Sequence, residues 1–311
     1  MSPNAPAAAT ETPQARLRNG VLTALIAFGI WGFLPIYFKI LQAVPALEIL
    51  AHRILWSIPF GALIIATRSQ WPEVRQVFRN PRTFGLLALS AFFIAVNWLV
   101  YVWAVQHSAI FQASLGYYIN PLMYVVIGVW FFAEQLRPLQ IAAVVLAALG
   151  VAVLTVSGGQ FPWIAVTLAI SFTIYGVVRK QTDVGGMPGL FTETLILCPF
   201  ALAYLAFMIN TGTAIFMSGS LAGDALLALA GPLTVIPLLC FALAARRLNL
   251  STIGIMQFIA PTLQFLVGVA YGEPLTTAHI ICFGCIWTAV AVFSWDAWRR
   301  SRPQLALPGT G

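Results

Sequence analysis

Ten long apolar segments constrain the fold of this sequence more than any other feature. Each has roughly the 20 residues that a helix needs to cross the hydrocarbon core of a bilayer. The segments are continuously apolar rather than alternating, which argues against a transmembrane β-barrel and favours helices that satisfy their own backbone polar groups. They cover residues 20–41, 46–67, 83–105, 111–133, 138–156, 162–180, 188–209, 224–245, 251–271 and 276–298. We therefore predict an all-α membrane protein with ten transmembrane helices.

The composition agrees with a membrane protein, because 60% of the 311 residues are hydrophobic and only 8% are charged. The surface of a water-soluble domain needs far more charge. A net charge of +7 would suggest nucleic acid as a partner in a soluble protein. Here the basic residues are dispersed at helix ends, so we predict membrane lipids as partners and no nucleic acid.

The basic residues are distributed asymmetrically along the chain. All but two of the sixteen lysines and arginines lie in the tails or near the ends of the second, fourth, sixth and eighth segments. An excess of Lys and Arg in short loops marks the cytoplasmic side of a membrane. We therefore predict that both tails, a disordered 1–19 and a short 299–311, are cytoplasmic. The two exceptions are Lys39 and Arg53.

The second half of the chain repeats features of the first at an offset of about 140 residues. Pro59-Phe60 aligns with Pro199-Phe200 in this way. Because a five-helix unit has an odd number of helices, a second copy enters the membrane from the opposite face. We predict two inverted repeats, 20–156 and 162–298, which is typical of transporters that open a midplane site to alternate sides. A duplicated channel or enzyme is the alternative.

Few ionisable residues lie inside the predicted helices, where each costs about 2.5–3.5 kcal/mol on insertion scales. Glu48 and His52 share a helix face, and with Arg53 they can bracket a cavity and reach Lys39 across a short turn. A structural ion-pair network or snorkelling is the alternative. At the 140-residue offset Arg53 aligns with Glu193. The candidate gating or coupling residues are therefore Lys39, Glu48, His52, Arg53 and Glu193.

Uncharged polar and aromatic residues concentrate on the third, fourth, sixth and ninth segments. Ser114, Tyr117, Tyr118 and Pro121 follow helical spacing and form one stripe. In lipid such a stripe faces protein or water, and we favour a substrate cavity over interhelical hydrogen bonding. The candidate substrate-binding residues are Arg53, Trp98, Tyr101, Tyr117, Tyr118, Asn120, Tyr175 and Gln257.

Several motifs of energy-coupled or catalytic proteins are absent from the sequence. It contains neither a GxxxxGK[ST] nucleotide-binding motif nor an HExxH zinc motif. Cys282 and Cys285 form a CxxC, but the three histidines lie on three different helices, so we predict packing rather than a metal or redox site. We predict a secondary transporter without cofactors, with a proton or ion as the candidate coupling species. The alternative is an intramembrane enzyme that acts on a lipid-linked substrate. We disfavour it because the sequence shows no constellation of catalytic residues.

Several sequence stretches, in the same order and spacing, resemble the RarD-type permeases of the EamA branch of the drug/metabolite transporter superfamily. They include Glu48–Arg53, Asn97–Trp98, Ala113–Leu122, Glu193–Thr194 and Pro261–Thr262. The resemblance implies ten helices, cytoplasmic termini, a central cavity between the halves, and export of a small organic metabolite or drug from a bacterium across its inner membrane. A monomer or a homodimer is expected. Gln112 stands where these permeases usually have a glutamate, so we expect no proton coupling at that position.

Overall fold

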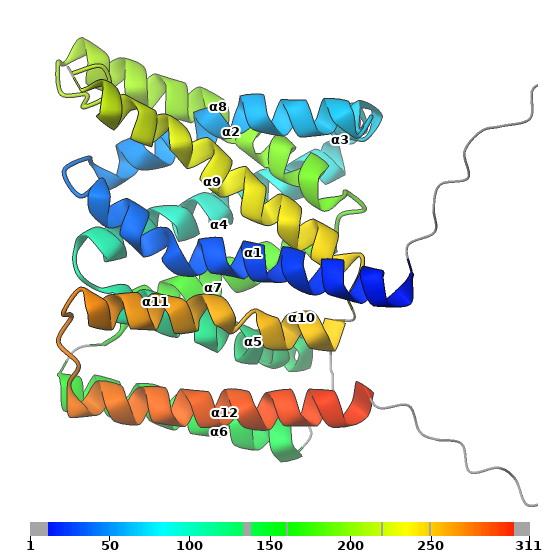
Figure 1. Cartoon of the computed structure of the whole chain (residues 1–311), viewed down its shortest axis with the longest axis vertical. Helices are drawn as coiled ribbons and strands as arrows, with labels where there is room; N and C mark the ends of the chain where they lie inside the picture. The colour runs from blue at the N-terminus through cyan, green and yellow to red at the C-terminus, as the bar shows by residue number, and fades with distance from the viewer. Residues whose placement is uncertain (1–11, 133–137, 160, 219, 249, 302–311) are drawn as a thin grey trace, which may run out of the picture.

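The computed structural model describes residues 12–132, 138–159, 161–218, 220–248 and 250–301, which form a bundle of helices (Figure 1). Within these residues, nine stretches of helix are long and apolar enough to cross a membrane. The chain is thus a multi-pass, all-α membrane protein in its described part. The helices are α1 (Pro13–Ile40), α2 (Ala46–Thr67), α3 (Trp71–Arg79), α4 (Pro81–Gln106), α5 (Ile110–Phe132), α6 (Pro138–Gly158), α7 (Trp163–Lys180), α8 (Gly186–Asn210), α9 (Leu221–Ala245), α10 (Leu250–Met256), α11 (Ile259–Ala270) and α12 (Thr277–Ser301).

Helix α1 begins at Pro13, inside the stretch 1–19 that we expected to be a disordered tail. The Thr12 side chain accepts a hydrogen bond from the Ala15 backbone N–H, and proline suits the first turn of a helix because it has no N–H to leave unpaired. At the other end α12 continues to Ser301, beyond the expected 298. The remaining parts of the two expected tails, 1–11 and 302–311, lie outside the described residues.

The ninth apolar segment is divided into α10 and α11, with Gln257 and Phe258 between them. Pro261 accounts for this break, because it has no N–H to donate to the carbonyl of Gln257 four residues earlier. Proline is tolerated in the first turn of α11 instead. The apolar run 251–271 predicted one continuous helix, so the break at Gln257 is a correction.

Helix α3 was not expected and lies in the connection between the second and third segments. Val74 and Val77 on one of its faces are buried, whereas Arg75 and Arg79 are exposed. The buried face packs against α4 and α8. The helix is therefore amphipathic and is anchored by its apolar side.

The two halves of the chain interleave rather than forming separate bodies. Helix α2 packs on α8 and α9, and α4 packs on α7 and α8. Helix α1 contacts α9 and α11, α5 contacts α7 and α11, and α6 pairs with α12. The approach of α2 to α9 depends on Gly231, where a Cβ would lie 2.3 Å from the Trp56 carbonyl oxygen.

The connections gather at two ends of the bundle, which we call the left end and the right end after their places in Figure 1. The left end holds the α1–α2, α4–α5, α6–α7, α8–α9 and α11–α12 connections, and the right end holds α3, the α7–α8 and α9–α10 connections and both ends of the described chain. Arg68, Arg179 and Arg246 end helices at the right end. Lys39 ends α1 at the left end, and Arg53 lies inside α2.

Candidate functional site

Arg53 is buried where α2 meets α4 and α9, with only 5% of the residue exposed. Its Nε donates a hydrogen bond to Thr234 Oγ1 on α9 at 3.2 Å. Its guanidinium carbon lies 4.5 Å from the centre of the Trp98 ring and 5.5 Å from that of Phe38. These contacts with aromatic faces stabilise the cation without neutralising it. We call Arg53, Phe38, Trp98, Tyr101 and Thr234 the central site.

Two polar atoms of the central site are buried without a hydrogen-bond partner, Nη1 of Arg53 and the hydroxyl of Tyr101. The Tyr101 residue is 3% exposed, and its ring centre is 5.9 Å from that of Phe38. A buried polar group without a partner costs free energy, so such groups are candidates for contact with a ligand.

A row of aromatic rings leads away from the central site. Consecutive ring centres are 5.9 Å apart from Phe38 to Tyr101, 5.6 Å to Tyr117, 6.0 Å to Phe172 and 5.9 Å to Tyr175. The Tyr117 hydroxyl donates to Asn97 Oδ1 at 3.0 Å, which fixes it against α4. We call these five rings the aromatic row.

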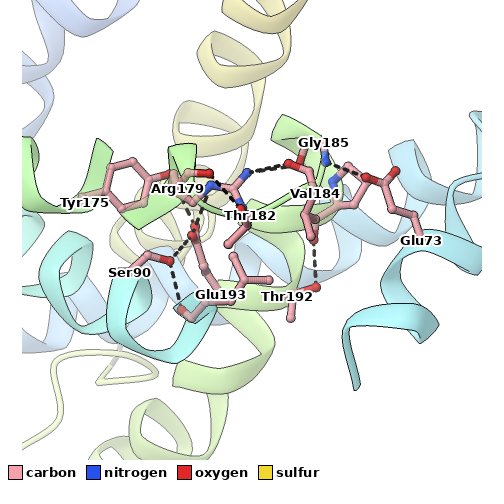
Figure 2. Close-up of polar contacts among 11 residues, drawn as sticks. Glu73, Ser90, Tyr175, Arg179, Thr182, Val184, Gly185, Thr192 and Glu193 are labelled. Atoms are coloured by element: carbon pink, nitrogen blue, oxygen red, sulfur yellow. Dashed lines mark hydrogen bonds and ion pairs between the residues drawn. The ribbon is translucent and has the colours of Figure 1, made fainter. Parts of the chain in front are cut away.

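At the far end of the aromatic row, Glu193 on α8 is fully buried and is held by three side chains (Figure 2). Ser90 Oγ of α4 donates to Glu193 Oε1 at 2.5 Å, and the Tyr175 hydroxyl donates to Oε2 at 3.5 Å. Arg179 Nε of α7 lies 3.6 Å from Oε1 and forms an ion pair with it. Glu193 therefore ties α8 to α4 and α7, and we call this cluster the right-end lock.

Arg179 also joins the lock to the α7–α8 connection. Its Nη2 donates to the carbonyl oxygens of Val184 at 3.4 Å and Gly185 at 3.1 Å (Figure 2). Its guanidinium lies against Gly189 so closely that a Cβ there would be 2.0 Å from Nη1. A side chain at 189 would therefore have to displace the guanidinium of Arg179.

The amphipathic helix α3 contacts the same connection through Glu73. Its Oε1 accepts a hydrogen bond of 2.5 Å from the Gly185 backbone N–H, immediately before α8 (Figure 2). A carboxylate suits the start of a helix, where the backbone N–H groups are unpaired. Beside this contact lies a polar cavity of about 370 Å³, whose lining includes Glu73, Arg82 and Asp183. Helix α3 is therefore joined to the α7–α8 connection at the right end by this hydrogen bond.

At the left end, Glu48 performs a comparable role. Its Oε1 accepts hydrogen bonds from the backbone N–H groups of Ile215 at 2.9 Å and Phe216 at 3.0 Å. The His52 ring lies 4.6 Å from the Phe216 ring, and the Trp56 indole donates to His52 Nδ1 at 3.2 Å. These contacts hold the α8–α9 connection over the start of α2, and we call them the left-end lock.

The structure does not assemble the four charged residues of the first half into one cluster. Lys39 Nζ donates to Ser108 Oγ at 2.9 Å and lies 5.8 Å from the Tyr271 ring centre, instead of reaching Glu48 or His52. Ser108 belongs to the turn between α4 and α5, which adjoins the end of α1. The expected contact of Lys39 across the 41–45 turn is therefore wrong.

The predicted polar stripe on α5 is divided between two surroundings. Tyr117 belongs to the aromatic row, whereas the Tyr118 hydroxyl is 2.7 Å from Thr262 Oγ1 of α11 and its ring stacks on Phe258. Neighbouring residues on a helix point about 100° apart, so one faces α4 and α7 and the other faces α11 and α12. Asn120 is buried with an unpaired Oδ1, and Gln257 is half-buried at the α10–α11 break.

Several residues of these sites could not be predicted, or were not predicted, from the sequence. Phe38, Ser90 and Thr234 look like ordinary members of apolar helices, and nothing in the local sequence distinguishes them. Glu73 was overlooked because it lies in a connection, although its place on a short amphipathic pattern was a usable signal. Arg179 was counted in the cytoplasmic charge excess and was given no role in a site.

Comparison with known proteins places the chain among bacterial membrane transporters. Residues 18–156 match the EamA-like transporter family. The chain is 44% identical over 299 residues to "Uncharacterized transporter PA0485" of Pseudomonas aeruginosa, covering 95% of this chain and 99% of that protein. It is 43% identical over 281 residues to "Protein RarD" of Escherichia coli K12, covering 90% of this chain and 95% of that protein.

A solved crystal structure also supports the fold, although not the function. It shares 20% sequence identity with this chain, and the two superpose with a TM-score of 0.59. The match covers 91% of this chain and 99% of the other. Nearly all of the helical arrangement in Figure 1 thus has an experimental counterpart.

Proposed function

Because the chain belongs to the RarD-type permeases of the EamA-like transporter family, we propose that it exports a small organic solute across the bacterial inner membrane by alternating access. The observation that carries this proposal is the placement of the central site between two locks, one at each end of the bundle. Alternating access requires a site that can be closed from either side. The left-end lock and the right-end lock provide those two closures.

The pattern of helix packing supports two inverted five-helix repeats, with α5 as a tenth span. In these repeats α1, α2, α4, α5 and α6 correspond to α7, α8, α9, α10–α11 and α12. Under this correspondence the α2–α9 contact becomes the α8–α4 contact, and the α4–α7 contact becomes the α9–α1 contact. Both members of each exchange are observed contacts. The pairs α2 with α8, α5 with α11, and α6 with α12 convert into themselves. Two units related by such exchange can trade conformations with each other.

The two buried charges follow the same exchange. Arg53 on α2 reaches the hydroxyl of Thr234 on α9, and Glu193 on α8 reaches the hydroxyl of Ser90 on α4. Since α2 corresponds to α8 and α9 corresponds to α4, these are equivalent contacts with opposite charges. The repeat thus supplies a cation toward one end and an anion toward the other.

The proposed cycle opens one lock while the other stays closed. Opening the right end separates Arg179 from Glu193 and α3 from Gly185. Opening the left end releases the α8–α9 connection from Glu48. Glu193 is the proposed coupling group, because a proton on its carboxylate would remove the charge that attracts Arg179. A proton, another ion or a second solute can then supply the driving force.

Counterflow in proteoliposomes tests this function. Vesicles loaded with a mixture of unlabelled organic solutes should accumulate the labelled form of a transported solute transiently, and protein-free vesicles should not. A passive channel or an enzyme would not produce counterflow. Absence of accumulation for every solute tested, with protein correctly inserted, would contradict the proposal.

The proposed orientation places the right end in the cytoplasm, because Lys and Arg collect on that side. Labelling of single cysteines in intact cells should mark positions near 158 and 215, at the left end, from outside. Positions near 75 and 300 should react only after the membrane is permeabilised. Labelling of position 75 from outside would reverse the orientation.

A further inference from the structure

The central site contains a buried cation without a counter-ion. Among the described residues, no carboxylate lies within ion-pair distance of Arg53, and the side chain that accepts its hydrogen bond is the neutral hydroxyl of Thr234. Glu193 is paired with Arg179. Glu48 belongs to the left-end lock, where its Oε1 accepts two backbone N–H groups and its buried Oε2 has no hydrogen-bond partner. Taking an arginine out of water is costly unless an anion accompanies it. The central site therefore has a charge imbalance that an anionic ligand would correct.

The unpaired atoms of the central site indicate what kind of anion fits. Arg53 Nη1 can only donate, and the Tyr101 hydroxyl can donate one hydrogen bond. The aromatic rings of Trp98 and Phe38 contact the guanidinium, which leaves N–H groups at its edge for an acceptor. A carboxylate has two oxygen atoms that can accept from both donors. A phosphate dianion would bring a second negative charge for which the site has no second described cation.

On this basis, and resting on the function proposed above, we propose that the transported solute is a small monocarboxylate with a flat, apolar body. The carboxylate binds Arg53 and Tyr101, and the body lies along the rings of Trp98 and Tyr117. Aromatic faces provide large apolar contact for such a body.

The same geometry disfavours an amino acid. An ammonium group beside the carboxylate would bring a positive charge close to Arg53, and no described carboxylate at the central site is available to balance it. A simple carboxylate should therefore bind more tightly than the amino acid with the same body.

Titration calorimetry on the purified protein in lipid nanodiscs tests this substrate class. The probes are 3-phenylpropanoate, 3-phenylpropanamide, 3-phenylpropylamine and phenylalanine, together with 4-methylpentanoate and its amide. Each carboxylate should bind at least about tenfold more tightly than its amide, since an acceptor that lacks charge leaves the guanidinium unbalanced. The amine should not bind, and phenylalanine should bind more weakly than 3-phenylpropanoate.

Variants assign the interaction to the central site. Arg53→Gln should remove carboxylate binding, and Tyr101→Phe should weaken it roughly threefold to tenfold, as expected for one lost hydrogen bond. Tyr271→Phe removes a hydroxyl from a half-exposed tyrosine outside the central site and should bind like the wild type. Circular dichroism and gel filtration identify any variant that has not folded, and Tyr101→Phe keeps the ring and hence the packing.

The outcomes separate this inference from the transport function. If no carboxylate in the series exceeds its amide, or if Arg53→Gln binds carboxylates normally, the proposed substrate class is wrong. Counterflow of neutral or cationic solutes in that case would leave the transport proposal standing. Counterflow of 3-phenylpropanoate that competes with 4-methylpentanoate and not with the amides would support both.

Discussion

The central site buries the charge of Arg53 and the right-end lock buries that of Glu193, but the two charges differ in whether the protein supplies an oppositely charged partner. Glu193 is satisfied by an arginine, a serine and a tyrosine, all within the protein. Arg53 has aromatic faces, one neutral hydroxyl and an unpaired Nη1. A buried charge that is paired within the protein stabilises one arrangement of helices, whereas a buried charge without such a pair is suited to a ligand that binds reversibly.

This difference assigns different tasks to two positions that correspond in the repeat. The right-end lock joins three helices, so its strength should affect stability and the opening of one end. The central site joins fewer polar partners, so its side chains should affect binding more than stability. Each of the following variants changes one side of this comparison.

Arg53→Lys should have the largest effect on transport. A lysine keeps the positive charge but has a compact ammonium instead of a planar fork, and it cannot stack on Trp98 in the same way. We expect counterflow to fall by about tenfold to a hundredfold with little change in thermal stability, because the lost hydrogen bond from Arg53 to the charged ligand is worth about 1.5–3 kcal/mol. Proteoliposome flux and thermal unfolding in detergent measure the two effects. Normal flux in this variant would show that the fork is not used.

Glu193→Gln should reduce both transport and stability. The change leaves Arg179 without its carboxylate, and breaking a buried ion pair in this way costs about 3–5 kcal/mol, less here because Arg179 keeps two backbone acceptors. Adding Arg179→Gln should recover part of the lost stability, since it removes the unpaired cation. A double-mutant cycle from thermal unfolding gives this coupling, and purely additive effects would show that the two residues do not interact.

Gly189→Ala should weaken the right-end lock without removing a charge. The new Cβ would overlap the Arg179 guanidinium and displace it, at a cost of about 1–3 kcal/mol for forced repacking. Gly284→Ala is the matched control, because a Cβ at that helical position has no neighbour within 4 Å. Unfolding midpoints of the two variants should differ clearly. Equal midpoints would mean that Arg179 moves aside at no cost.

Glu73→Gln should have the smallest effect on stability. The amide can still accept a hydrogen bond from Gly185, but the bond is no longer assisted by charge, which is worth about 1 kcal/mol. We expect the right end to open more often, so a cysteine placed at Gln181 in the α7–α8 connection should react faster with a hydrophilic thiol reagent. Asn80→Asp, at the start of α4, changes charge by one unit nearby without removing the Glu73 contact and serves as the control. A labelling rate unchanged from the wild type would exclude α3 from the closure.

The positions of most helices could be predicted from the sequence because the bilayer imposes one dominant requirement. A span must be apolar and long enough, and that requirement acts on each segment separately. Helix α2, for example, has the predicted bounds 46–67. The prediction failed where a local effect competed with hydrophobicity, as at Pro261, or where a short helix lies outside the apolar runs, as with α3.

The pairing of the buried charges could not be obtained in the same way. Arg53 and Glu193 were identified as candidates because ionisable residues are rare in apolar segments, a property of the sequence alone. Their partners come from other helices, and Thr234 lies 181 residues from Arg53 in the chain. Side chains such as Thr234 and Ser90 acquire a role only from their position beside a charge.

By itself, the sequence determined that the chain enters a membrane, which segments form helices, and which few residues carry charge within them. Hydropathy and charge act residue by residue, so they can be evaluated without knowing any contact. The tertiary structure decided which of those charges is paired and which is left for a ligand. It also placed Tyr117 and Tyr118 against different helices and Gly189 against the Arg179 guanidinium. These contacts depend on packing between helices that are distant in the sequence, so no local sequence pattern predicts them.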